Sequence, residues 1–77
     1  MNLDILSFIT FCVGHLADAL QMPASEVYRK LRTSGILTGY IIPNYDVLHT
    51  FSREYIIEDL IECMKEKGVL GKEYGSR

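Results

Sequence analysis

The sequence predicts a small, mainly α-helical domain built from three helices. Two stretches repeat apolar residues at intervals of three and four, which places them on one face of a helix. Pro and Gly residues between these stretches mark where helices begin and end. We therefore predict helices over residues 3–21, 23–33 and 53–67, and a short extended or irregular link over 36–51. The two apolar faces are Leu6, Ile9, Val13, Leu16 and Leu20, and Ile56, Ile57, Leu60, Ile61 and Met64.

Length and composition indicate one domain that associates with itself. The chain has 77 residues, of which 48% are hydrophobic, with a net charge of −2. That apolar fraction is high for so small a chain, so some apolar groups must meet a second copy, and we predict a homodimer. The charge gives no overall attraction to nucleic acid or to an anionic membrane. We assign residues 1–70 to a single helical domain and 71–77 to a frayed tail that lacks apolar support.

The first predicted helix is apolar on more than one face. Asn2 is the expected N-cap, because its side chain can accept a backbone N–H of the first turn. Gly14 costs stability inside a helix, which predicts that another helix crosses closely there. Asp4, His15 and Asp18 interrupt the apolar run, so we expect neither a signal peptide nor a membrane span, and a cytoplasmic protein.

The stretch from Leu16 to Gly35 predicts two helices joined by a tight turn, as in a helix-turn-helix. Gln21 stands where such a unit usually has Gly, because the turn requires positive φ. Pro23 suits the first position of the second helix, and Gly35 its left-handed cap. Because Gln21 departs from the pattern, an ordinary corner between two helices fits as well.

The outer face of the second predicted helix is basic. In a helix-turn-helix this face contacts phosphates, so it is a candidate surface for nucleic acid or another partner. A solvated face, with cations favoured near a helix C-terminus, is the simpler alternative. Arg53 would extend the face if it lay nearby. The candidate residues are Ser25, Arg29, Lys30 and Arg32.

The predicted link gathers polar residues that form a candidate loop site. An Asp and a His three residues apart can serve acid–base chemistry, but no nucleophile or pocket accompanies them. We therefore predict structural roles: Asp46 caps a helical turn, His49 bonds to backbone, and the tyrosines cover the core. Pro43 biases Ile42 towards an extended conformation. The site residues are Tyr40, Asn44, Tyr45, Asp46 and His49.

The outer face of the last predicted helix is acidic. Glu58, Glu62 and Glu66 lie four residues apart, which is mildly repulsive and suggests a basic partner. A solvated face is again the alternative. Ser52 is the expected N-cap, and Gly68 is expected to end the helix in a Schellman motif.

No catalytic, cofactor or metal site is predicted from the sequence. The two cysteines, Cys12 and Cys63, lie within apolar helical faces, so free thiols in a reducing compartment are expected. The sequence has no cluster of Cys and His residues that would indicate a zinc site. We expect a protein that is not an enzyme.

The segments MPASEVYRKL, SGIL-x-GYI and YDVLHT resemble a family of short bacterial proteins of unknown function, number 3791 among such families. The resemblance extends from Phe8 to Gly68. It implies a regulatory, antitoxin-like role through a protein partner and assigns no catalytic residue.

Two functions remain open from the sequence. The first is a non-enzymatic interaction or regulatory module that acts through a protein partner. The second is a helix-turn-helix DNA-binding regulator. Neutralising phosphates is the main source of DNA affinity, so an acidic chain with one cluster of cations favours the first.

Overall fold

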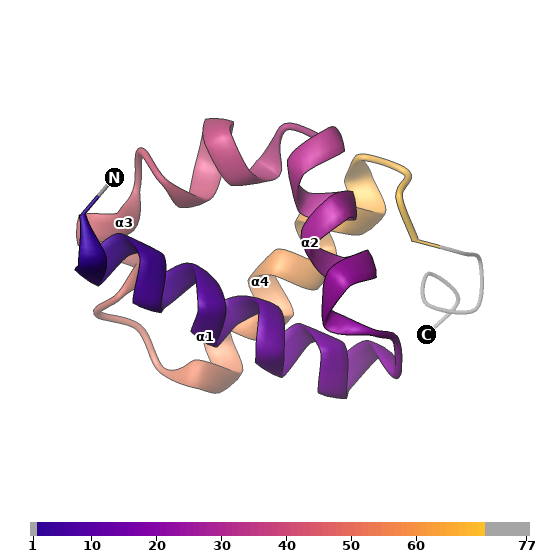
Figure 1. The fold of residues 1–77 in the computed structure, drawn as a ribbon, viewed down its shortest axis with the longest axis horizontal. Coiled ribbons are helices and arrows are strands. Elements are labelled where there is room, and N and C mark those ends of the chain that lie inside the picture. The colour runs from indigo at the N-terminus through magenta and orange to yellow at the C-terminus, as the bar shows by residue number, and fades with distance from the viewer. Residues whose placement is uncertain (1, 71–77) are drawn as a thin grey trace.

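The computed structural model describes residues 2–70, and these form a helical fold without strands. The elements in order are α1 (Leu3–Leu20), α2 (Ala24–Thr33), the π-helical turn η1 (Leu37–Ile41), α3 (Tyr45–Leu48) and α4 (Arg53–Glu66) (Figure 1). The predicted mainly α fold is confirmed. Helices α1, α2 and α4 are the three predicted helices, and each end lies within one residue of its predicted position.

The core lies where α1, α2, η1 and α4 meet. Leu16, Val27, Leu31, Ile41 and Leu60 are fully buried there. Burying one such side chain stabilises the fold by about 1.5–3 kcal/mol. The predicted apolar face of α1 is buried from Ile9 onwards. Leu6 belongs to the predicted face but is 50% exposed, because the buried part of α1 begins at Ile9.

Two predictions for α1 have opposite outcomes. The Asn2 side chain accepts the Ile5 backbone N–H at 2.8 Å, so the predicted N-cap is confirmed. The predicted helix crossing at Gly14 is wrong. Gly14 is exposed, and a Cβ built on it would meet nothing within 4 Å. Neighbouring Cys12, Val13 and Leu16 face the core, which turns Gly14 towards solvent.

The corner between α1 and α2 contains a left-handed residue, Gln21, although this position is not Gly. Gln21 has φ +57° and ψ +51°, the left-handed conformation, and the Met22 N–H donates to the Ala17 carbonyl at 3.1 Å. Pro23 was expected to be the first residue of α2, but it is the extended residue before the helix, with ψ +146°. Its carbonyl accepts the Val27 N–H at 3.1 Å, so Pro23 begins the hydrogen bonding of α2 from the cap position.

The link after α2 is helical, so the predicted extended segment is wrong. Ile42, expected to be extended before Pro43, has φ −66° and ψ −49°, and its N–H donates to the Leu37 carbonyl at 3.1 Å. Ile36, Leu37 and Ile41 are at most 4% exposed. A helical path turns all three towards the core, and this burial outweighs the preference of β-branched residues for strands.

The remaining helix ends show which capping predictions hold. Asn44, not Asp46, is the residue before α3, and Asp46 lies in its first turn. The Ser52 hydroxyl accepts the Tyr55 N–H at 3.2 Å, as predicted for α4. Gly68 has φ +72° and its N–H donates to the Lys65 carbonyl at 3.0 Å. The Val69 N–H donates to the Met64 carbonyl at 3.1 Å, which completes the predicted Schellman motif. The predicted tail, 71–77, lies outside the described residues.

Candidate functional site

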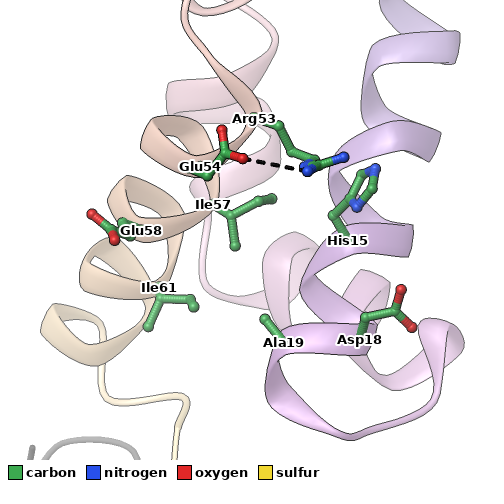
Figure 2. Close-up of a pocket in the computed structure, with 8 residues that line it drawn as sticks. All are labelled: His15, Asp18, Ala19, Arg53, Glu54, Ile57, Glu58 and Ile61. Carbon is green, nitrogen blue, oxygen red and sulfur yellow. Dashed lines mark hydrogen bonds and ion pairs between the residues drawn. The ribbon is translucent and has the colours of Figure 1, made fainter.

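A groove of about 530 Å³ lies between α1 and α4 and is open to solvent. Ala19 of α1 and Ile57 and Ile61 of α4 form its apolar floor (Figure 2). Its remaining lining residues are His15 and Asp18 on α1, and Arg53, Glu54 and Glu58 on α4. The groove therefore combines an apolar floor with a charged rim.

The charges of this rim are largely uncompensated. The Arg53 guanidinium lies 3.3 Å from the Glu54 carboxylate. A hydrogen bond from its own backbone N–H, and then the charge of Arg53, lower the pKa of Glu54. Asp18 and Glu58 have no ion pair with any residue in the described range 2–70. Figure 2 shows these two carboxylates on the outer flanks of the groove, with Glu58 pointing away from α1 and Asp18 pointing away from α4.

Sequence reasoning did not find this groove. Its α1 residues and its α4 residues are more than thirty positions apart in the chain, and no spacing rule links them. Arg53 was considered as an extension of the basic face of α2, but it lines the α1–α4 groove instead. The groove is a product of tertiary packing.

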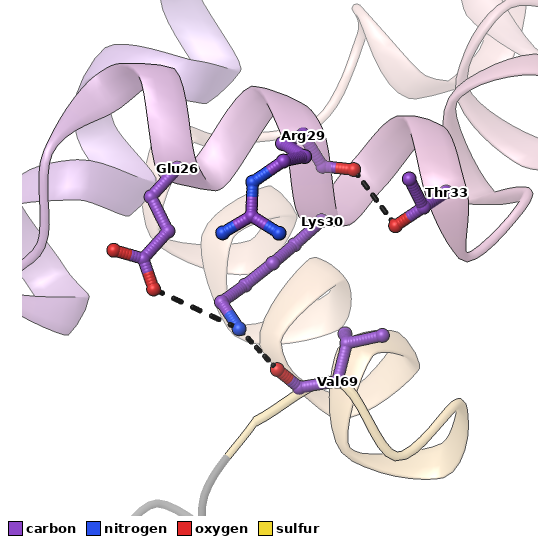
Figure 3. A network of polar contacts seen from close by, with 5 residues as sticks. All are labelled: Glu26, Arg29, Lys30, Thr33 and Val69. Carbon is purple, nitrogen blue, oxygen red and sulfur yellow. Dashed lines mark hydrogen bonds and ion pairs between the residues drawn. The ribbon is translucent and has the colours of Figure 1, made fainter.

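The predicted basic face of α2 is only partly available to a partner. Ser25, Arg29 and Arg32 are exposed, but Lys30 is half-buried. The Lys30 ammonium donates to the Val69 carbonyl at 2.8 Å and lies 3.8 Å from the Glu26 carboxylate (Figure 3). Lys30 therefore ties α2 to the chain after α4, which leaves two of the three predicted cations as a free surface.

Arg32 and Arg29 differ in their local contacts. The Arg32 guanidinium lies 5.8 Å from the centre of the Tyr28 ring, a cation–π distance. The Arg29 carbonyl accepts the Thr33 hydroxyl at 2.9 Å, and the Arg29 side chain points to solvent (Figure 3). Both side chains remain accessible on the outer face of α2.

The structure separates the predicted loop-site residues between two sides of the link. The Tyr40 hydroxyl donates to the Asp59 carboxylate at 2.5 Å, and this hydrogen bond, followed by burial, raises the pKa of Tyr40. The Asn44 amide donates to the Tyr40 carbonyl at 2.8 Å. Tyr40 therefore joins η1 to α4, and its ring is partly buried against the core, as predicted for the tyrosines.

Tyr45 and His49 form part of a run of aromatic contacts with α1. The Tyr45 ring meets Phe8 edge-on, with ring centres 5.5 Å apart, and stacks on His49 at 4.7 Å. His49 thus packs against Tyr45, where a bond to backbone was predicted. Asp46 is exposed. The loop residues serve separate contacts and do not converge on one site.

The predicted acidic residues of α4 also divide between different surroundings. Glu58 lies on the rim of the α1–α4 groove. Glu62 is 3.8 Å from Lys65. Glu66 borders a smaller pocket of about 270 Å³ that includes Tyr40, Cys63 and Lys67. Of these three glutamates, only Glu58 lines the α1–α4 groove.

Several large apolar side chains are exposed. Leu3 is 78% exposed and lies near Leu6 at the start of α1, and Val47 of α3 is 56% exposed. The other large apolar side chains that are exposed among residues 2–70 are Phe11, Tyr28, Phe51 and Tyr55. A contiguous exposed apolar patch is typical of a binding surface, and among these residues Leu3 and Leu6 are neighbours, one helical turn apart on α1.

The two thiols are free, as predicted. Cys12 is fully buried, and this burial raises its pKa from 9.0 to about 12. Cys63 is half-buried, and burial also raises its pKa. Among residues 2–70, no three His, Cys, Asp or Glu side chains are grouped so as to hold a metal ion.

Comparison with protein families assigns the chain to one family. Residues 7–67 match the model of DUF3791, described as a protein of unknown function. The chain belongs to DUF3791. The predicted resemblance is confirmed, and the DUF3791 match includes every residue of the α1–α4 groove. No curated protein and no solved structure matched the chain.

Helix α1 of this DUF3791 protein also has the length and composition of a membrane span. It has 18 residues and a mean hydropathy of 1.6, and it lies near the N-terminus. Its buried residues, Ile9 to Leu20, belong to the same core as those of α2 and α4. Within this stretch, 28% of the residues are buried inside the structure.

Proposed function

We propose that this chain is a cytoplasmic, non-enzymatic interaction module that acts through a protein partner. The observation that carries the proposal is the exposure of large apolar side chains on a 77-residue chain, among them Leu3, Leu6 and Phe11. Burying apolar surface is the main driving force for association of proteins. A regulatory, antitoxin-like role is one form of this function.

The proposal that the module is not an enzyme rests on how the polar residues are used. Tyr40 is bonded to Asp59, and Tyr45 and His49 are stacked on one another. An acid–base site needs a base within hydrogen-bond reach of the proton that it takes, beside a pocket for substrate. These side chains support contacts between η1, α3, α4 and α1 instead.

We propose that the module also forms a homodimer through the exposed start of α1. Static light scattering at high micromolar concentration tests this, with Leu6→Ser/Phe11→Ser as the variant. Wild-type protein should have twice the monomer mass, and the variant should be monomeric with unchanged far-UV circular dichroism. A monomeric wild type contradicts the dimer.

Affinity capture from the native host tests the interaction function. Tagged wild-type chain, cross-linked before lysis, should retain a defined protein. A Leu3→Ser/Val47→Ser variant, with a wild-type circular dichroism spectrum, shows whether these exposed side chains contribute. If only nucleic acid or nothing is retained by the wild type, the interaction module is wrong.

A DNA-binding regulator is the second candidate, favoured by the left-handed turn at Gln21 and by exposed Arg29 and Arg32. Two such helices in a dimer would need to lie about 34 Å apart to enter successive major grooves. The use of Lys30 within the fold and the acidic net charge weigh against it. Electrophoretic shifts at two salt concentrations decide: salt-sensitive binding lost in Arg29→Ala/Arg32→Ala supports DNA binding.

A further inference from the structure

We infer that the groove between α1 and α4 binds a basic amphipathic helix of the partner protein. This inference rests on the proposed function and names the surface and the chemistry of its partner. A helix laid in an apolar groove is a recurring mode of recognition, in which the ligand presents apolar residues at intervals of three and four.

The shape of the groove fits a helix better than an enclosed small molecule. The groove lies between two helices and is open to solvent, with a volume of about 530 Å³. Ile57 and Ile61 are one helical turn apart on its α4 side, and exposed Ala19 stands opposite them on α1 (Figure 2). Because Ala19 is small, it leaves room for a side chain of the ligand between the two helices.

The charge of the groove selects a basic ligand. Asp18, Glu54 and Glu58 contribute three negative charges and Arg53 one positive charge, which leaves a net charge of −2 with His15 neutral. This equals the net charge of the whole chain, −2. Since Arg53 is paired with Glu54, the free carboxylates are Asp18 and Glu58, one on each helix. Cations on both flanks of a docked helix would meet them.

Other occupants fit this groove less well. Nucleic acid and anionic lipid would be repelled by the carboxylates. The basic helix of a second copy, α2, exposes only Tyr28 as a large apolar side chain and therefore lacks the apolar stripe that the floor needs. The ligand is accordingly a helix of a different protein.

Designed peptides test the inference with the full chain. The probe is a 14-residue peptide with leucines at helical intervals of three and four and lysines elsewhere. Its controls are the same peptide with glutamate for lysine, and a scrambled leucine–lysine peptide. We expect saturable binding of the probe by fluorescence anisotropy, and amide shift changes in nuclear magnetic resonance spectra centred on Ala19, Ile57 and Ile61. The control peptides should bind at least ten-fold more weakly.

Charge reversal tests the site itself. Asp18→Lys/Glu58→Lys should raise the Kd of the probe by about ten-fold or more at low salt. The matched control, Asp46→Lys/Glu66→Lys, reverses two exposed carboxylates outside the groove and should change the Kd by less than about three-fold. If the first variant fails to fold, Ala19→Lys replaces it, because this exposed position blocks the floor.

Several results would overturn the inference. Equal losses in the two double variants would show that only net charge matters, and tight binding of the glutamate peptide would remove the charge argument. Shift changes centred on Leu3 and Leu6 would place the ligand elsewhere. If the captured host protein binds Asp18→Lys/Glu58→Lys as well as wild type, the groove is wrong and the interaction function stands. If wild type captures no protein, the interaction function itself fails.

Discussion

Replacement of Gln21 tests whether the α1–α2 turn holds a strained residue. Gln21 is the non-glycine residue among residues 2–70 with positive φ, at +57°. It occupies the position after a helix where Gly is usual, because L-residues clash in the left-handed conformation. We predict that Gln21→Gly stabilises the protein and that Gln21→Ala does not.

The magnitude follows from three opposing effects. Relief of the left-handed conformation gains about 1–2 kcal/mol. The greater freedom of Gly in the unfolded chain costs about 0.4–1 kcal/mol. Loss of the exposed hydrogen bond from the Gln21 amide to the Asp18 carbonyl, 2.7 Å long, costs up to about 0.5 kcal/mol. The free energy of unfolding should rise by about 0.5 kcal/mol in Gln21→Gly. It should be about 1 kcal/mol higher in Gln21→Gly than in Gln21→Ala.

Urea denaturation and thermal melting of the three proteins measure these differences. A difference of 1 kcal/mol corresponds to about 4–8 °C in Tm for a chain of this size. Gly35→Ala is the reciprocal control: its φ is +86° and a Cβ would meet nothing within 4 Å, so only the backbone resists the change. Gly35→Ala should lower the free energy of unfolding by about 1 kcal/mol. If Gln21→Ala is as stable as Gln21→Gly, the argument from backbone strain is refuted.

Three further predictions concern contacts that the fold creates. Lys30→Met keeps the aliphatic stem but removes the bond to the Val69 carbonyl, and should lower the free energy of unfolding by about 1–2 kcal/mol in urea. Tyr40→Phe should cost about 1 kcal/mol at neutral pH by removing the bond to Asp59. Because folding raises the pKa of Tyr40 above 10.0, its stabilising effect is present below pH 10 and is lost as pH rises further, so wild type should lose stability more steeply than Tyr40→Phe in alkaline melts. Native Cys12 should react with a disulfide reagent at pH 8 at least a hundred-fold more slowly than in urea, because it is buried and its pKa is about 12.

Each of these has a result that contradicts it. Unchanged stability of Lys30→Met would mean that water replaces the ammonium at the Val69 carbonyl. Parallel alkaline melts of wild type and Tyr40→Phe would show that the phenol titrates alike in both states. Rapid modification of native Cys12, measured in a Cys63→Ser background, would show that α1 opens readily.

The helices and their ends could be predicted from the sequence because local rules govern them. Apolar spacing predicted α1 and α4, Pro23 and Gly35 marked the ends of α2, and side-chain capping predicted Asn2 and Ser52. The Schellman motif at Gly68 needs only a residue that tolerates positive φ. Each of these features depends on residues within about one helical turn, so the sequence contains all that determines it.

The link and the groove were decided by tertiary structure. Tyr40, Ile41 and Ile42 favour a strand locally, but a helical path buries Ile41 completely and brings Tyr40 to Asp59. Burial against distant residues outweighs a preference of about 1 kcal/mol. Lys30 likewise is not free on the basic face of α2, because its ammonium donates to the Val69 carbonyl in the chain after α4.

The sequence by itself thus determined the three longer helices, α1, α2 and α4, and where they end to within one residue. Tertiary structure alone decided that Ala19 and Ile61, far apart in the chain, share one groove, and that Asp18 and Glu58 lie on its two sides. The physical reason is that helix formation depends on neighbours three and four residues away, whereas a binding surface depends on how whole helices cross.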